Sequence, residues 1–194
     1  MEKTKLKVLG LADIRRKGIG SRRIHKGYMF IYSGSNNSKN GVGFILHPDV
    51  ASCVLDIKMI SDRIIRIDIK QSERTMTLVQ IYAPCNDNYT EEDKDEFFDD
   101  LADVVHKVEL NNTLYDFNGK IGPSRRDYEE YMGLHIAKNS DKNGNGQRML
   151  DLCSQYHLFI TNTFYEHRDS QIYTWYKWNN VDCKSQIDYI LART

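Results

Sequence analysis

The sequence predicts a mixed α/β fold, with two mostly antiparallel sheets packed face to face and helices covering their outer faces. Three observations support this fold class. The first half of the chain repeats short segments of alternating apolar and polar residues, joined by polar turns. Two amphipathic helical patterns occur only in the second half, and each is followed by further strand-like segments. Because the connections between successive strands are short, antiparallel meanders are expected.

Six strands are predicted in the first half of the chain. The clearest alternation places Ile65, Ile67 and Ile69 on one face and charged residues on the other. The polar, turn-rich stretch 33–41 separates two of the strands. The predicted strands cover residues 7–11, 28–32, 42–47, 53–58, 65–70 and 75–82.

Two helices are predicted in the second half. Thr90 is a suitable N-cap for the first, because three acidic residues follow it in the first turn, where the helix dipole stabilises them. Apolar residues then recur at helical spacing, which predicts a buried face opposite an acidic, solvated face. The buried face comprises Phe97, Leu101, Val104, Val105 and Val108, and the acidic face comprises Asp95, Glu96, Asp99 and Asp100. The second helix is predicted over residues 147–157, and further strands over 112–118, 158–164, 172–176 and 186–191.

Two of these later strands carry an acid inside an apolar run. Asp116 lies in the run LYDFNG, and Asp188 lies in the run SQIDYIL. A carboxylate in such a place is costly unless it accepts hydrogen bonds, binds a metal or takes part in chemistry. Asn118 follows Asp116 at the two-residue period of a strand, so both side chains are expected on the same side. The two runs therefore predict one polar site at the edge of a buried sheet.

Together with other segments in the same order, these runs resemble the motifs of the endonuclease/exonuclease/phosphatase superfamily. LYDFN resembles its GDFN-type strand, SQIDYIL its IDYIL-type strand, IYAP its YAP segment, LADIR its LQETR-type run, and NGNGQRMLDLC the helix after the GDFN strand. The nearest in style are AP-endonuclease-like domains of RTE/BovB-type non-LTR retrotransposons and the derived craniofacial development protein 2-like proteins. The resemblance covers essentially the whole chain. It implies a four-layer αββα sandwich and phosphodiester hydrolysis of DNA with Mg²⁺ or Mn²⁺.

The resemblance also implies a role for each motif residue. Asp116 would orient or deprotonate the attacking water, Asn118 would hold a phosphate oxygen, and Tyr82 would donate to the developing charge. Asp188 would orient a histidine, as a carboxylate does in a catalytic triad. Asp13 stands where relatives have a metal-binding glutamate, and its shorter side chain reaches less far.

Most of these residues also have an ordinary structural interpretation. Asp116 could cap the loop that follows it, and Tyr82 could be a half-buried tyrosine of a sheet. Asp13 could form a surface ion pair with Arg15 or Arg16. Asp188 is the hardest to explain this way, because the sequence places it in the middle of a strand.

Contacts with nucleic acid are predicted at a basic run, an asparagine and a tryptophan. Residues 15–23 are basic and glycine-containing, which predicts a loop that either binds phosphates or is simply solvated. Trp178 is the tryptophan expected to be exposed and to stack on a base, whereas Trp175 is expected to pack at a strand end. Asn145 either lies near the nucleic acid, as the resemblance implies, or is a turn residue. The predicted contact residues are Arg15, Arg16, Lys17, Arg22, Arg23, Asn145 and Trp178.

The composition is typical of a soluble, intracellular globular protein. Hydrophobic residues make up 40% and charged residues 28%, and the formal net charge of zero argues against nucleic-acid affinity from global charge alone. No run approaches the roughly 20 apolar residues of a membrane span. Cys53, Cys85, Cys153 and Cys183 show no C-x-x-C spacing, so reduced and mostly buried thiols are expected. A nuclear location is an expectation from the resemblance.

Departures from the family pattern leave the activity open. The expected single domain, residues 1–194, would lack the family's first strand and its C-terminal SDH-type segment, and Tyr115 replaces the glycine of GDFN. Loss of one charge-stabilising or proton-transfer group commonly costs ~10²–10⁴ in rate. The chain is therefore either an Mg²⁺-dependent DNA endonuclease domain or an inactive domesticated or relic domain that binds DNA or protein. A phosphatase acting on a small phosphorylated substrate is the third hypothesis, and the sequence identifies no protein partner.

Overall fold

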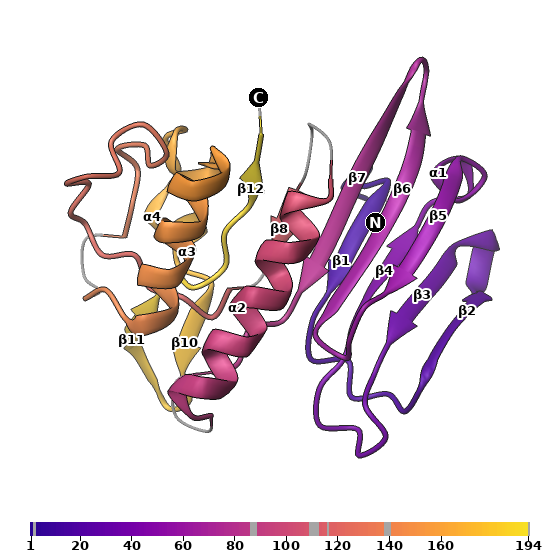
Figure 1. The fold of residues 1–194 in the computed structure, drawn as a ribbon, viewed down its shortest axis with the longest axis horizontal. Coiled ribbons are helices and arrows are strands. Elements are labelled where there is room, and N and C mark those ends of the chain that lie inside the picture. Colours follow the sequence, from indigo (N-terminus) through magenta and orange to yellow (C-terminus); the bar gives the residue numbers. More distant parts are fainter. Residues whose placement is uncertain (2, 86–88, 109–112, 116, 138–140, 194) are drawn as a thin grey trace. The chain divides into compact units, whose positions relative to one another are not determined.

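The computed structural model describes all residues except 2, 86–88, 109–112, 116, 138–140 and 194. The chain divides into two compact units, Met1–Tyr82 and Ala83–Thr194 (Figure 1). The prediction of one domain over residues 1–194 stays a prediction.

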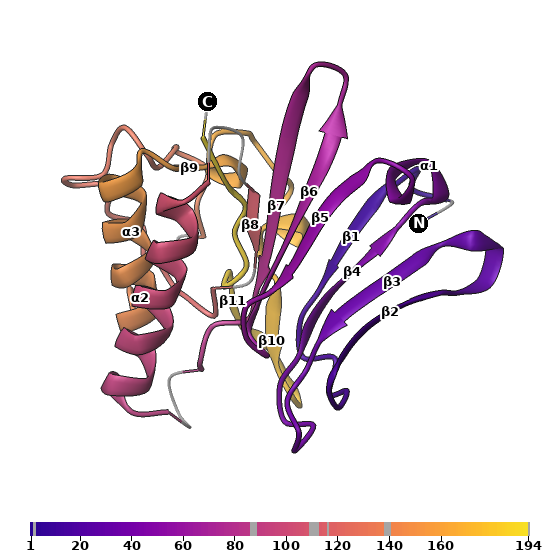
Figure 2. The same cartoon turned by 45° about the vertical axis from the view of Figure 1, so that its right-hand side comes forward.

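The first unit is built from two antiparallel groups of strands (Figure 2). One group has the strand order β1-β4-β3-β2, and the other has the order β5-β6-β7. The strands are β1 (Val8–Leu11), β2 (Ile19–Arg23), β3 (Met29–Ser33), β4 (Val42–Leu46), β5 (Val54–Met59), β6 (Ile64–Gln71) and β7 (Arg74–Ile81), with a 3-10 turn at His25–Gly27 and the short helix α1 at Pro48–Ala51.

The core of the first unit lies between these two groups of strands. Ile31 and Phe44 from one sheet pack with Ile65 and Ile67 from the other, and all four are fully buried. The isoleucine alternation therefore places its apolar face inward, as predicted. The opposite face of β6 is less solvated than predicted, because Asp68 is buried and accepts hydrogen bonds from Arg66 and Thr77.

The prediction of a loop over residues 15–23 is wrong for residues 19–23, because Ile19–Arg23 forms the edge strand β2. This strand pairs with β3 along its whole length, from Ile19 opposite Ser33 to Arg23 opposite Met29. An edge strand is paired on one side and can remain largely exposed, so its sequence needs no apolar alternation. A glycine- and arginine-rich run gave no signal for such a strand.

The second unit combines two helices with short strands. Helices α2 (Glu91–His106) and α3 (Gly144–Tyr156) lie side by side (Figure 1). Strands β8 (Thr113–Tyr115), β12 (Leu191–Ala192) and β9 (Phe159–Ile160) pair antiparallel in that order. A hairpin consists of β10 (Trp175–Lys177) and β11 (Asn180–Ser185), and short helical turns occupy Thr161–Thr163 and Asp169–Ile172 (α4). In the described part of the chain, no helix combines the length and apolarity that crossing a membrane requires.

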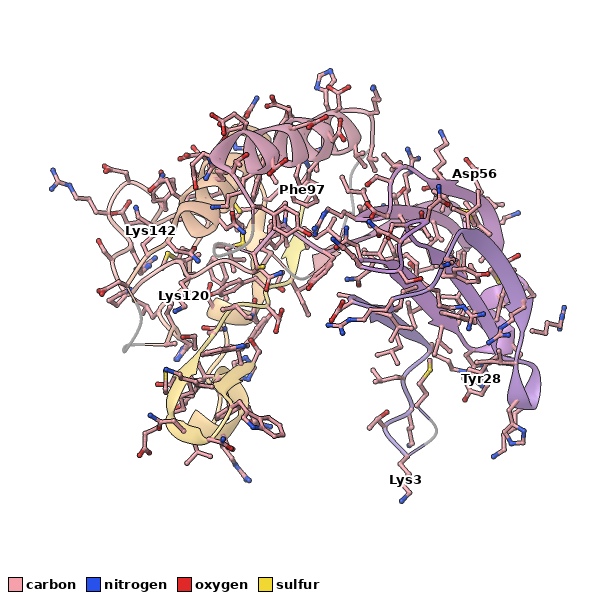
Figure 3. All side chains as sticks on the ribbon, turned by 90° about the horizontal axis from the view of Figure 1, so that it is seen from below. Lys3, Tyr28, Asp56, Phe97, Lys120 and Lys142 are labelled. Carbon is pink, nitrogen blue, oxygen red and sulfur yellow. The ribbon has the colours of Figure 1, made fainter. Side chains whose placement is uncertain are left out.

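Helix α2 begins as the sequence predicts. The Thr90 side chain accepts from the backbone of Asp93, and the Asp93 side chain accepts from the backbone of Thr90, which forms a capping box. All five residues of the predicted apolar face are buried. Figure 3 labels one of them, Phe97, which packs edge-on against Phe98.

Several boundaries in the second unit differ from the predictions. Helix α3 starts three residues earlier than expected, because Asn143 caps it and two glycines precede Gln147. The predicted strand 158–164 is reduced to β9 and a helical turn, and residue 172 belongs to α4. The predicted strand 186–191 is also wrong, since only Leu191–Ala192 pairs. These segments are short, and hydrogen bonds from side chains replace the backbone hydrogen bonds that would pair them as strands.

An ion-pair cluster joins α2 to α3. Arg148 of α3 donates to Glu91 at 3.0 Å and also binds Asp95, while Lys94, almost fully buried, donates to Glu91 at 2.6 Å. The hydrogen bonds from Lys94 and then from Arg148 lower the pKa of Glu91 below its ordinary value. The ionised form is therefore preferred in the folded protein.

This cluster predicts a pH-dependent stability. A carboxyl with a lowered folded pKa stabilises the fold at pH values above its unfolded pKa, about 4.3, and that contribution is lost as the pH falls through the folded pKa. Replacing Glu91 by Gln is expected to lower Tm at pH 6, with the difference from the parent shrinking below about pH 4. Glu96→Gln, at an exposed α2 residue without an ion pair among the described residues, is the control. An equal Tm difference at pH 6 and pH 3 would contradict the assignment.

The four cysteines form no disulfide with one another, and the prediction that most of them are buried is wrong. Cys153 on α3 is fully buried, and burial raises the pKa of its thiol well above the ordinary value. Cys85 is half-buried, and Cys53 and Cys183 are exposed. Cys183 is exposed because it lies on the solvated hairpin strand β11.

Candidate nucleic-acid interface

Asp13 and Arg15 face each other in the first unit. Arg15 donates from Nε to Asp13 Oδ1 at 3.0 Å and from Nη2 to Oδ2 at 2.9 Å, so each carboxylate oxygen accepts one hydrogen bond from the guanidinium. The hydrogen bond to Asp13, and then its charge, raise the pKa of Arg15. This pair agrees with the ordinary structural interpretation of Asp13, and its predicted metal contact stays a prediction.

Tyr82 lies over a guanidinium at the end of the first unit. Arg63 is 9% exposed, donates from Nη1 to the Tyr82 carbonyl at 2.7 Å, and has its guanidinium carbon 5.3 Å from the Tyr82 ring centroid. Its Nη2 also donates to Asn40 Oδ1 at 3.1 Å. Neither Arg63 nor Asn40 belongs to a recognisable motif, so neither was predicted from the sequence.

The basic run places two arginines on aromatic rings. Arg16 lies 5.0 Å from the ring centroid of Tyr32, and Arg22 lies 5.8 Å from that of Phe30. These two rings stack on each other with centroids 5.2 Å apart. Cation–π contacts restrict the guanidinium positions and do not use the hydrogen-bond donors at the edge of the guanidinium.

Asn118 forms a turn in the second unit, while Asp116 lies outside the described residues. Asn118 has φ 47°, in the left-handed region that asparagine tolerates. Its Nδ2 donates to the carbonyl of Ala83 at 2.8 Å. This contact fixes the backbone that follows Tyr82 in sequence, and the predicted phosphate contact of Asn118 stays a prediction.

Asn145 is fully buried in the first turn of α3. Its Nδ2 donates to the carbonyls of Pro84 at 2.7 Å and Phe117 at 3.3 Å, and its Oδ1 has no hydrogen-bond partner among the described residues. A contact with nucleic acid requires an accessible side chain, so this prediction needs correction. Asn145 instead links two backbone segments of the candidate site.

Asn143 and Gly146 were not singled out by the sequence, yet they hold the same region together. Asn143 Oδ1 accepts from the backbone N–H groups of Gly146 and Lys120, both at 2.8 Å. The close approach requires glycine, since a Cβ on Gly146 would lie 1.9 Å from the Lys120 carbonyl oxygen. The signal was an asparagine followed three residues later by a glycine, at the N-cap of a helix.

Asp188 lies in the irregular segment before β12 and not in a strand. The backbone N–H groups of Ile187 and Asp188 donate to Thr174 Oγ1 at 3.1 and 3.2 Å, so a threonine hydroxyl replaces the expected strand ladder. The Asp188 carboxylate makes no hydrogen bond or ion pair with any residue that the structure describes. Burial, and to a lesser extent the charge of Asp188, raise the pKa of Tyr189.

The hairpin β10–β11 presents aromatic residues to solvent. Trp178 at its turn is 88% exposed, which agrees with the expectation for this residue. Trp175 is 40% exposed, so its predicted packing at a strand end is wrong. Lys184 of β11 places its ammonium 4.3 Å from the ring centroid of Tyr173, which precedes β10 in sequence.

The described residues do not fit a divalent metal ion. Mg²⁺ requires oxygen ligands, and each oxygen of the Asp13 carboxylate already accepts a hydrogen bond from the Arg15 guanidinium, whose positive charge repels a cation. Among the residues outside the masked positions, no three His, Cys, Asp or Glu side chains gather closely enough to hold a metal. The predicted residues are divided between the units: Asp13, Arg15, Arg16, Lys17, Arg22, Arg23 and Tyr82 lie in the first, and Asn118, Asn145, Trp178 and Asp188 in the second.

Known proteins resemble this chain in sequence and in fold. No protein-family model matches it. The whole chain aligns with craniofacial development protein 2 of Bos taurus at 26% identity and of Tragulus javanicus at 25%, and it spans about a third of the length of these curated relatives.

Two solved endonuclease structures match nearly the whole chain. The endonuclease domain of TRAS1, a telomere-specific non-LTR retrotransposon, gives a TM-score of 0.63 at 10% identity, covering 99% of this chain and 74% of that one. AP endonuclease LMAP from Leishmania major gives 0.65 at 11% identity, covering 98% and 71%. These likenesses confirm the predicted fold class, and the chain has the mixed α/β fold of these two endonuclease structures.

Proposed function

We propose that this chain is a DNA-binding domain built on an endonuclease fold. The observation that carries the proposal is the exposed aromatic hairpin β10–β11. Four large side chains of this hairpin are exposed to solvent: Trp175 by 40%, Tyr176 by 46%, Trp178 by 88% and Val181 by 75%. Large apolar side chains gathered in one exposed place are typical of an interaction surface.

The chemistry of this hairpin favours a nucleic acid as the partner. Every base offers a flat face on which an indole or phenol ring can stack, and stacking contributes about 1–3 kcal/mol per base. Lys177 and Lys184 lie on the same two strands and can neutralise nearby phosphates. A hairpin tip with an exposed tryptophan can also wedge between base steps in the minor groove.

A basic surface on the first unit supports the same proposal. Arg16 and Arg22 are held on the Tyr32 and Phe30 rings, and Arg23 is exposed on the same edge strand. Guanidinium groups fixed in this way can bind phosphate oxygens through two N–H groups at once. Both structural neighbours are endonucleases, which agrees with a DNA ligand. A nuclear location follows as part of the proposal.

A second candidate function is phosphodiester hydrolysis of DNA with Mg²⁺ or Mn²⁺. One observation favours it: the Asp188 carboxylate is free of any described partner in a segment that matches the family's IDYIL-type motif. The occupied Asp13 carboxylate weighs against it. DNA binding without cleavage is therefore the function that the described residues support better.

Plasmid nicking and DNA binding, measured on the same preparation, separate the two candidates. We expect the chain to bind a labelled duplex in EDTA and to leave supercoiled plasmid intact with Mg²⁺ or Mn²⁺. Asp188→Asn and Asp116→Asn should leave binding within a factor of about three, because each removes a negative charge and no phosphate contact. Metal-dependent nicking that both substitutions abolish would establish the second candidate and overturn the first.

A further inference from the structure

The loop that carries Asp13 is held rigidly in place by its backbone. Asp13 and Arg15 both have left-handed φ values, 50° and 49°, and Ile14 between them donates its N–H to the Gly41 carbonyl at 3.1 Å. The Arg15 N–H donates to the Asn40 carbonyl at 3.1 Å. A Cβ on Gly41 would lie 2.6 Å from Ile14 Cγ1, so the close approach of these segments needs glycine.

In this backbone arrangement Arg15 is the counter-ion of Asp13. The guanidinium binds both oxygens of the carboxylate in the two-pronged geometry that gives the strongest pairs. The Arg15 side chain is nevertheless 71% exposed, while that of Asp13 is 35% exposed. Only two of the five N–H groups of the guanidinium are used by Asp13, so the other three can donate to a ligand.

The surroundings of the pair favour an anion as that ligand. Arg63, in the same unit, lies against the Tyr82 ring and donates to the Tyr82 carbonyl. Asn40 bonds to Arg63 with its side chain and to Arg15 with its carbonyl. Asn40 therefore links the Arg63 guanidinium, a second positive charge, to the backbone of the segment that carries Arg15.

We propose that Arg15 takes the place of a divalent cation at Asp13, so that this site binds a DNA phosphate through a guanidinium and does not bind Mg²⁺. A fixed guanidinium supplies a positive charge and directed N–H donors to a phosphate, without requiring free carboxylate oxygens. The phosphate half of this inference rests on the proposed DNA-binding function. The metal half is independent of it.

The metal half is tested by Mn²⁺ titration of the full chain, followed by electron paramagnetic resonance of free Mn²⁺. Parent protein and Asp13→Asn are expected to give the same titration curve, because Asp13 holds no metal in either. A Mn²⁺ site that is present in the parent and lost in Asp13→Asn would overturn the inference. This readout requires neither DNA nor activity.

The phosphate half is tested by binding to a labelled duplex in EDTA. Arg15→Ala is expected to weaken binding about tenfold, and to lower the slope of log affinity against log salt by about 1. Arg126→Ala is the matched control, because Arg126 is exposed in the other unit, about 4.0 Å from Asp127, and should change affinity less than twofold. Equal affinities for the parent and Arg15→Ala would overturn this half. A parent that binds no DNA would overturn it together with the proposed function, while the Mn²⁺ comparison would still decide the metal half.

Discussion

Replacing Gly146 by alanine is expected to destabilise the protein by about 3 kcal/mol. The new Cβ would lie 1.9 Å from the carbonyl oxygen and 2.5 Å from the carbonyl carbon of Lys120. Both are backbone atoms, so a rotamer change cannot relieve the overlap and the start of α3 must shift away. That shift would also break the hydrogen bond from Gly146 N–H to Asn143 Oδ1. For a chain of this size, Tm should fall by about 6–12 °C.

Ser154→Ala on the exposed side of the same helix is the matched control. Alanine favours helix formation and the site is solvated, so its stability should change by less than about 0.5 kcal/mol. Equal Tm values for Gly146→Ala and Ser154→Ala would show that the contact between α3 and Lys120 is looser than the structure has it. Gly146 would then not be required for the close approach of α3 to Lys120.

Replacing Trp178 by alanine is expected to weaken DNA binding by about 5- to 150-fold, the equivalent of about 1–3 kcal/mol of lost stacking. Trp178 is 88% exposed and contributes little to the core, so Tm should stay within about 2 °C of the parent value. The measurement is the equilibrium affinity for a labelled duplex and for a single strand of the same sequence.

Two further variants make this result specific to the hairpin. Trp178→Phe retains an aromatic face and should recover most of the affinity. Tyr165→Ala removes another exposed aromatic residue, 68% exposed and outside the hairpin, and should change affinity less than twofold. If Tyr165→Ala and Trp178→Ala lose affinity equally, general surface hydrophobicity explains the binding and the hairpin has no special role.

The sequence predicted the parts of the fold that depend on buried periodicity. The isoleucine alternation of β6 and the apolar face of α2 are both where expected, because burial imposes a regular spacing on the chain. Edge strand β2 and the segment around Asp188 were predicted wrongly. Strand β2 is hydrogen-bonded on one side only, and the Asp188 segment is held by a side-chain hydroxyl. Neither arrangement imposes a periodic pattern of apolar residues on the sequence.

For the candidate site, the sequence indicated which residues to consider better than it indicated where their side chains lie. Trp178 is exposed as expected, whereas Asn145 is buried and acts between backbone carbonyls. The alternative of a simple ion pair for Asp13 could be stated from sequence. The choice of Arg15 over Arg16 could not, because it depends on two left-handed residues and their contacts with Asn40 and Gly41. Arg63 carried no sequence signal because its partner Tyr82 is 19 residues away.

The most direct test of the account is the equilibrium binding of the chain to a labelled DNA duplex in EDTA, measured across a range of salt concentrations. DNA binding through fixed arginines and an aromatic hairpin predicts saturable binding whose affinity falls linearly on a log–log plot as salt increases. It also predicts that added Mg²⁺ acts only as additional salt. Absence of binding at low salt by the folded protein, or binding that requires Mg²⁺, would contradict the account.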